Sequence, residues 1–89
     1  MDSILQSNHY CYLCGEPYTE THHVFFGTAN RKLSDADGCV IYVCRKHHEL
    51  IHRNHKVDLT IKARMQMKWE EVNGKTTEDF RKRYGKSYV

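Results

Sequence analysis

The chain has 89 residues, of which 39% are hydrophobic and 28% are charged, with a single proline. This composition excludes a disordered or fibrous protein and predicts one small globular domain over residues 1–89. A chain this short buries a modest core, so such domains often depend on a metal or on disulfides. The formal net charge is +3, but all 14 Lys and Arg lie between Arg31 and Lys86. Such an uneven basic surface suits a polyanion partner, and ordinary solvated helices would produce it equally well.

The sequence also bears on the compartment of the protein. No segment approaches the roughly 18 apolar residues of a membrane span. The first ten residues, "MDSILQSNHY", lack the basic start and apolar run of a signal peptide. We therefore expect a cytoplasmic protein with no membrane partner, in which the four cysteines bind metal rather than form disulfides.

The elements expected first along the chain are strands and loops. Residues 8–30 predict a short hairpin that includes "YCYLCGEPY" (10–18), which has the Cys-x-x-Cys-Gly form of a zinc knuckle. In the same stretch, "THHVFF" (21–26) has the β-branched and aromatic character of a strand. "GTANRKLSDADG" (27–38) is rich in loop-forming residues and predicts a loop. "CVIYVC" (39–44) predicts a second strand.

From about Arg45 the pattern becomes helical. A helix over 57–72 would start at Asp58 as N-cap and present one apolar stripe, made of Ile61, Met65, Trp69 and Val72. A last helix would begin at a capping Thr76 and end at Gly85, with Phe80 and Tyr84 facing inward. The sequence therefore predicts an α+β fold in which a core over 9–55 is followed by a helical extension over 57–89.

Two pairs of residues have the spacing of zinc ligands. One pair is Cys-x-x-Cys and the other is Cys-x-x-His, and together they comprise Cys11, Cys14, Cys44 and His47. Four such ligands form the closed tetrahedral site of a structural zinc, although unliganded buried thiols are the alternative. Cys39 is left over. It is either a small core residue or a substitute for Cys44 or His47, but its distance in sequence from Cys44 is not a knuckle spacing.

Four further histidines remain once that zinc site is filled. His48 and His52 are four residues apart on the expected helix, so both imidazoles can reach one ion. His22 and His23 are neighbours in a strand and must point to opposite faces. One of them can ligate the ion while the other contacts something else, such as a water molecule. This leaves the open coordination shell of a catalytic metal, unless the histidines are simply solvated.

The pattern "CYLCG … THH … CRKHH … H" resembles the HNH endonucleases, whose fold is the ββα-metal finger, over roughly residues 9–55. The segment "ETHHVFFGTANRK" is similar to that of small phage and prophage HNH proteins, and to the phage recombination-enhancing nucleases that act with a host recombinase. The resemblance implies a ββα-metal fold with a structural zinc knuckle and two further C-terminal helices. It also implies a bacterial host cell and a DNA partner, together with a recombination or phage protein that confers specificity.

The resemblance further implies roles for individual residues. The catalytic ion would be held by His22, His48 and His52, and His23 would be the general base that deprotonates water. The structural zinc would occupy Cys11, Cys14, Cys44 and His47. The position of the family's central asparagine is Cys39 here, and Asn30 is the only asparagine in the intervening loop, so the orienting role is assigned to Asn30. Arg31, which follows it, would contact phosphate.

We therefore expect a metal-dependent DNA endonuclease that uses one divalent ion, either Mg²⁺, Mn²⁺, Ni²⁺ or Zn²⁺, besides its structural Zn²⁺. Two other functions remain open from the sequence. A non-catalytic zinc-ribbon module that binds nucleic acid would need only the first ligand set and the basic surface. A zinc-stabilised adaptor for protein partners would need only the first ligand set.

Overall fold

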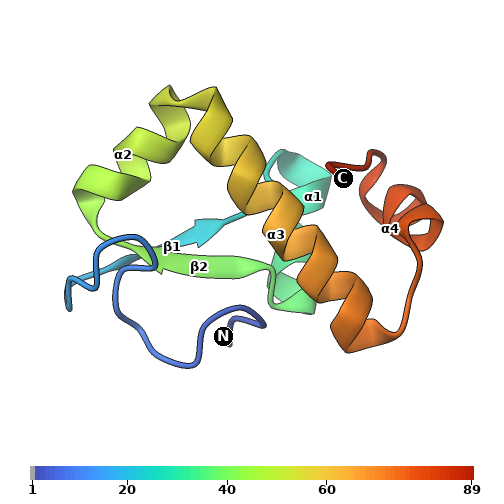
Figure 1. The fold of residues 1–89 in the computed structure, drawn as a ribbon, viewed down its shortest axis with the longest axis horizontal. Helices are drawn as coiled ribbons and strands as arrows, with labels where there is room; N and C mark the ends of the chain where they lie inside the picture. The colour runs from blue at the N-terminus through green and yellow to red at the C-terminus, as the bar shows by residue number, and fades with distance from the viewer. Residues whose placement is uncertain (1) are drawn as a thin grey trace.

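The computed structural model describes residues 2–89 and shows a two-stranded sheet with four helices, so the expected α+β class is confirmed (Figure 1). The elements follow one another as β1 (Glu20–His23), α1 (Thr28–Asp37), β2 (Val40–Val43), α2 (Arg45–Arg53), α3 (His55–Asn73) and α4 (Thr77–Tyr84). Among the described residues, none of these helices combines the length and hydrophobicity needed to cross a membrane.

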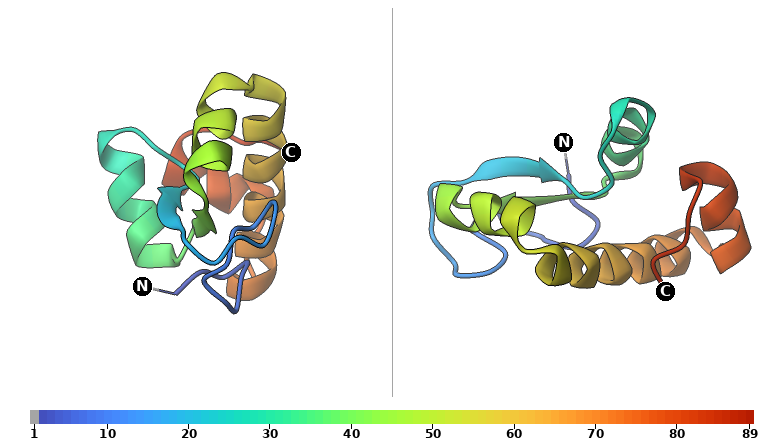
Figure 2. Two further views of the ribbon diagram at one scale, coloured as in Figure 1. Left: turned by 90° about the vertical axis from the view of Figure 1, so that its left-hand side faces the viewer. Right: turned by 90° about the horizontal axis from the view of Figure 1, so that it is seen from above.

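The sheet and α2 form a ββα unit. The strands are antiparallel, with Glu20 opposite Val43 and His23 opposite Val40. Helices α1 and α2 extend from opposite ends of this sheet, and the long helix α3 runs back along one of its faces toward α4 (Figures 1 and 2). This arrangement places α2, which carries three of the seven histidines, beside β1, which carries two.

Two expectations for residues 8–38 are wrong. Residues 8–30 do not form a hairpin, because β1 is the one strand in that range and its partner is β2. The expected loop at 27–38 is instead α1, which ends at Gly38 with a left-handed φ of 73°. Its sequence has little apolar periodicity, so contacts with the rest of the fold stabilise it. The Ser34 hydroxyl donates to the Phe25 carbonyl at 2.8 Å, and Asp37 accepts from Trp69 Nε1 at 2.9 Å.

Helix α3 begins earlier than the sequence predicts. Its N-cap is Asn54, whose side chain accepts a hydrogen bond from the Val57 N–H at 3.2 Å, and not Asp58. Asp58 lies inside the helix and pairs with Lys62 at 2.9 Å. Of the expected apolar stripe, Val72 is exposed and three members are buried, namely Ile61, Met65 and Trp69.

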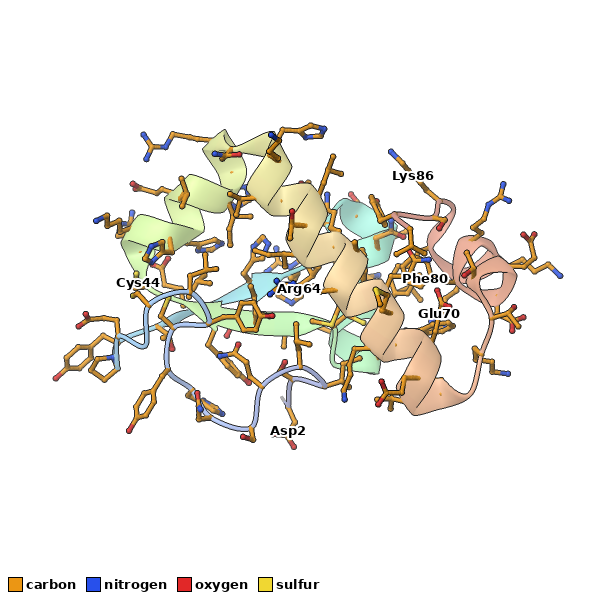
Figure 3. All side chains as sticks on the ribbon, viewed as in Figure 1. Asp2, Cys44, Arg64, Glu70, Phe80 and Lys86 are labelled. Atoms are coloured by element: carbon orange, nitrogen blue, oxygen red, sulfur yellow. The ribbon has the colours of Figure 1, made fainter. Side chains whose placement is uncertain are left out.

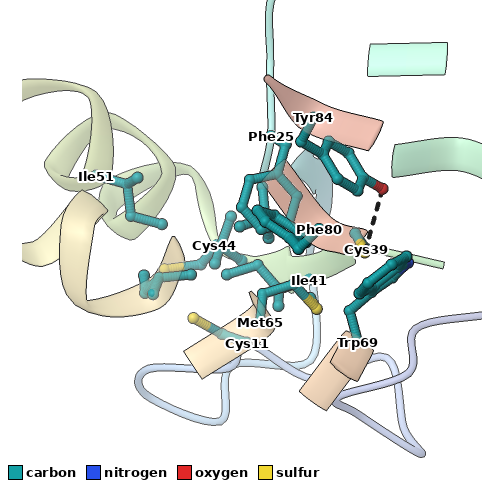
Figure 4. Packing of buried hydrophobic residues seen from close by; sticks show 13 residues of the cluster. Cys11, Phe25, Cys39, Ile41, Cys44, Ile51, Met65, Trp69, Phe80 and Tyr84 are labelled. Carbon is teal, nitrogen blue, oxygen red and sulfur yellow. Dashed lines mark hydrogen bonds between the residues drawn. The ribbon is translucent and has the colours of Figure 1, made fainter. Parts of the chain in front are cut away.

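The C-terminal helices complete a single hydrophobic core. Helix α4 has the expected capping box between Thr76 and Asp79. The ring of Phe80 lies 5.0 Å from that of Phe25 and 5.4 Å from that of Trp69, between ring centroids (Figure 4). The buried cluster that contains these rings also includes Cys11 of the knuckle. Helices α3 and α4 therefore cover the ββα unit and hold its ligands in place.

Candidate metal centres

Four potential ligands converge where the knuckle meets the start of α2. Cys14 Sγ and Cys44 Sγ lie 3.8 Å apart, and His47 Nδ1 lies 3.2 Å from Cys44 Sγ and 3.7 Å from Cys11 Sγ. All four ligand atoms lie within 4.8 Å of one another. In a tetrahedral zinc site, two sulfur ligands at about 2.3 Å from the ion are about 3.8 Å apart. The group therefore has the spacing of a structural zinc site.

The backbone around this group favours thiolates. Burial opposes ionisation of Cys11, but backbone N–H groups of Cys44, Leu13 and Cys14 outweigh it and lower the Cys11 pKa to about 6. Cys44 is also the N-cap of α2, at the junction of β2 and the helix (Figure 3). The donor chemistry of the group therefore fits Zn²⁺.

Cys39 lies apart from the zinc ligands. It is fully buried in the aromatic part of the core, with its Sγ 3.6 Å from the Tyr84 hydroxyl oxygen, while Cys11 and Cys44 face one another elsewhere in the cluster (Figure 4). Burial raises the Cys39 pKa to about 12, so the group remains a thiol at neutral pH. Of the two roles left open by the sequence, the structure supports that of a core residue.

A second group consists of three histidines from β1 and α2. The ring of His22 lies 5.1 Å from that of His48 and 5.4 Å from that of His52, between centroids. Their ligand nitrogens lie within 4.8 Å of one another. The helical spacing of His48 and His52 and the strand position of His22 thus bring the three residues together as the sequence predicts.

His22 is the buried member of this group. Its Nε2 has no hydrogen-bond partner. Burial lowers the pKa of His22 to about 3, and the neighbouring His48 and His52 contribute to the shift. A neutral imidazole with an unpartnered buried nitrogen is costly in a protein interior unless something ligates that nitrogen. A divalent ion ligated by this nitrogen would remove that cost, so the donor chemistry of the histidine group fits such an ion. A closed structural site would require a fourth ligand.

A carboxylate orients one of the other two histidines. His48 Nδ1 lies 2.9 Å from Glu20 Oε1, and Arg45 donates to Glu20 Oε2 at 2.9 Å. The hydrogen bond from His48, assisted by Arg45, holds the pKa of Glu20 below its ordinary value. The ionised carboxylate therefore accepts from Nδ1–H of His48 and leaves Nε2 free for an ion. Such a partner fixes both the tautomer and the orientation of a ligand histidine.

His23 projects from the other side of β1 and is hydrogen-bonded by Asp35 of α1. The contact joins His23 Nε2 to the carboxylate, so Nε2 carries the hydrogen and Nδ1 is left as an acceptor. Both β1 histidines nevertheless line one pocket of about 200 Å³, together with Thr21, Phe26, Arg31, His48 and His52. The structure thus places the His23 imidazole, held by Asp35, beside three histidines that could together hold a metal ion.

Of the two site residues predicted in the segment 27–38, Arg31 lies at the histidine pocket and Asn30 does not. Arg31 lines the histidine pocket, as a residue that contacts phosphate there would. Asn30 does not line that pocket, and its side-chain amide donates to the Tyr84 carbonyl at 3.3 Å, which connects α1 to the end of α4. Asp35, rather than Asn30, makes the hydrogen bond that orients His23.

Three residues that contact or line this site were not predicted from the sequence. Glu20 shares a strand face with His22, since the two are two residues apart, and this alternation was a usable signal. Asp35 lies in a segment expected to be a loop, and nothing in its spacing connects it to His23. Phe26 carries an exposed ring at the pocket edge that the sequence suggests only as part of a strand.

Comparison of the chain with protein-family models, with curated proteins and with solved structures finds no match. The residues of the two groups and their geometry are therefore the basis for a proposed function.

Proposed function

We propose that the protein is a metal-dependent endonuclease that hydrolyses phosphodiester bonds in DNA, as the resemblance to HNH endonucleases implies. One observation carries this proposal. Three histidines suited to a divalent ion and a fourth, held by a carboxylate, line the same small pocket. A structural site needs no additional oriented base, whereas metal-assisted hydrolysis of a phosphodiester uses a Lewis acid together with a base. The ββα arrangement of β1, β2 and α2 also agrees with the fold that the resemblance implies.

Five of the residues that line the pocket have a part in the proposed reaction. His22, His48 and His52 would hold a divalent ion, which when bound supplies Lewis-acid stabilisation of charge on the phosphate oxygens. His23 accepts a proton from the attacking water at Nδ1, and Asp35 keeps the proton on Nε2 of the same ring. Arg31 binds a phosphate of the strand and positions it against His23.

The zinc group has a supporting role in this proposal. Zn²⁺ at Cys11, Cys14, Cys44 and His47 would stabilise the knuckle and the first turn of α2. The catalytic ion would be Mg²⁺, Mn²⁺, Ni²⁺ or Zn²⁺, because imidazole ligands accept several of these metals. A chain this small has little surface with which to read a long site, so a recombination or phage protein in the host cytoplasm would supply specificity.

A plasmid-cleavage assay with the divalent ion varied tests the proposal. We expect ion-dependent conversion of supercoiled plasmid to nicked or linear DNA. We expect His23→Ala to slow this conversion by about 100-fold or more, the usual contribution of a general base. His55→Ala is the matched control, because His55 is an exposed histidine in the first turn of α3, outside both ligand groups.

The outcomes of this assay separate the functional classes. Equal cleavage by His23→Ala and the parent protein would contradict the assigned base. No cleavage with any ion, by protein shown to retain its zinc, would contradict the endonuclease proposal. A salt titration of DNA binding would then separate a nucleic-acid-binding module, whose affinity falls steeply with salt, from an adaptor that does not bind DNA.

A further inference from the structure

Phe26 presents an exposed aromatic ring beside the histidine group. The residue is 46% exposed, although Val24 and Phe25 just before it are buried. Its ring centroid lies 5.9 Å from that of His52 and 6.3 Å from that of His22. The ring also lines the same pocket as Arg31. A nucleotide held at the pocket would therefore lie next to this ring.

A buried cation fixes one side of the Phe26 ring. Lys62 Nζ lies 4.0 Å from the ring centroid and 2.9 Å from Asp58 Oδ2, and the side chains of Lys62 and Asp58 are each 10% exposed. The ring of Tyr88 lies 5.4 Å from the same ammonium. A cation in this position attracts the face of the ring, and more strongly when it is shielded from water. Lys62 therefore covers part of one face of the ring, while the residue as a whole stays 46% exposed.

This arrangement goes beyond an ordinary exposed phenylalanine. Single apolar side chains are common on protein surfaces. A buried ion pair, in contrast, carries a desolvation cost that the pairing seldom repays in stability. Here Asp58 keeps one buried carboxylate oxygen, Oδ1, without a hydrogen-bond partner. The chain thus maintains a costly ion pair beneath a ring that it leaves open to solvent at the pocket edge.

We propose that Phe26 stacks on an unpaired base of the nucleotide next to the phosphate held in the pocket. The inference rests on the proposed function and specifies its substrate as single-stranded or locally unpaired DNA. A base inside a duplex is covered on both faces by its neighbours, so only an unstacked base offers a face to the ring. Lys62 acts as a positioning residue, because it touches the ring and not the DNA.

Fluorescence binding with a short oligodeoxynucleotide that carries 2-aminopurine tests this inference. The measurement uses zinc-loaded His23→Ala protein with Mg²⁺, so that the DNA is not cleaved, and compares single-stranded with duplex probe. We expect Phe26→Leu to weaken single-strand binding by about 5- to 150-fold, the usual contribution of one stacked base, and to remove the quenching that stacking produces. We expect Phe26→Trp to retain both. Tyr18→Leu removes another exposed aromatic ring, outside the histidine pocket, as the control.

Each outcome either supports or overturns the inference. Loss of affinity and quenching with Phe26→Leu, but not with Tyr18→Leu, would support it. Unchanged single-strand binding by Phe26→Leu would overturn it, and so would an equal loss on single-stranded and duplex probes. If the His23→Ala protein binds neither probe, the proposed function fails as well. If it binds both and adding Phe26→Leu changes nothing, the inference alone fails.

Discussion

At the scale of single residues, hydrogen bonds to carboxylates decide which ring nitrogen is left free in two of the pocket histidines. Glu20 occupies Nδ1 of His48, and Asp35 occupies Nε2 of His23. The first contact leaves Nε2 of His48 available to ligate an ion, and the second leaves Nδ1 of His23 facing no carboxylate within residues 2–89. Both partners are carboxylates from other elements, so neither lies in the Cys/His pattern from which the ligands were predicted.

The hydrogen bond between Glu20 and His48 yields a prediction about metal affinity. We expect Glu20→Ala to weaken binding of a second Zn²⁺ by about 10- to 100-fold, the usual effect of losing such a partner, while the first zinc is retained. Calorimetric titration of protein that already holds one zinc measures this. Glu49→Ala is the control, because Glu49 pairs with the same Arg45, at 3.9 Å, whereas the carboxylate bonded to His48 is that of Glu20. Equal affinity of Glu20→Ala and the parent would rule out the orienting role.

At the scale of elements, regular spacing was predictable and tertiary stabilisation was not. The ligands on α2 follow from the periodicity of a helix, and β2 follows from a run of apolar residues. Helix α1 does not, because its stability depends on Ser34 and Asp37, whose partners lie outside the helix, on the loop before it (Phe25) and on α3 (Trp69). The start of α3 differs from the prediction because Asn and Asp cap helices about equally well, so residue type alone does not distinguish the observed cap, Asn54, from the predicted Asp58.

The elements also connect the two metal groups. Cys44 is the N-cap of α2 and His47 lies in its first turn, while His48 and His52 follow on the same helix. Loss of the first zinc would therefore free the start of α2 and displace the second group. We expect Cys14→Ala to lose the tightly bound zinc and also to bind a second ion more weakly. Metal analysis and calorimetry measure these two effects.

Cys39→Ala is the matched control for the zinc prediction, because it removes a buried thiol outside both ligand groups. We expect this variant to retain the zinc and to bind the second ion as the parent does. Unchanged binding of the second ion by zinc-free Cys14→Ala would show that the two groups are independent.

At the scale of the whole molecule, one carboxylate joins the helices that surround the sheet. Asp37, at the end of α1, accepts from Trp69 Nε1 at 2.9 Å, from Arg83 Nε at 2.6 Å and from the Tyr84 hydroxyl at 2.7 Å. Burial opposes ionisation of Asp37, but Arg83, Tyr84 and Trp69 outweigh it and hold its pKa below the ordinary value. These hydrogen bonds hold α3 and α4 against α1. The Cys/His pattern in the sequence gives no indication of them.

We expect Asp37→Asn to lower the free energy of unfolding at pH 7 by about 1.5–3 kcal/mol, the usual contribution of hydrogen bonds to a charged group. Because the folded-state pKa of Asp37 is depressed, its contribution is complete above the ordinary carboxyl pKa of about 4. It is lost as the pH falls below that value toward the folded-state pKa. Urea denaturation at several pH values measures this, and Glu71→Gln, an exposed carboxylate change, is the control. A difference that grows as the pH falls would contradict the assignment.

The adjacent histidine pairs have a consequence for how this chain tolerates changes in length. His22 belongs to the histidine group whereas His23 pairs with Asp35, and His47 belongs to the zinc group whereas His48 belongs to the histidine group. A shift of one residue in either segment would therefore exchange the two neighbours. Inserting or deleting a single residue within β1 would turn each later side chain of the strand to the opposite face. The same change in the first turn of α2 would rotate every later side chain by about 100°. Related chains that keep this chemistry should therefore differ by substitution around constant ligand spacing, with insertions confined to exposed segments outside the helices and strands, such as 15–18.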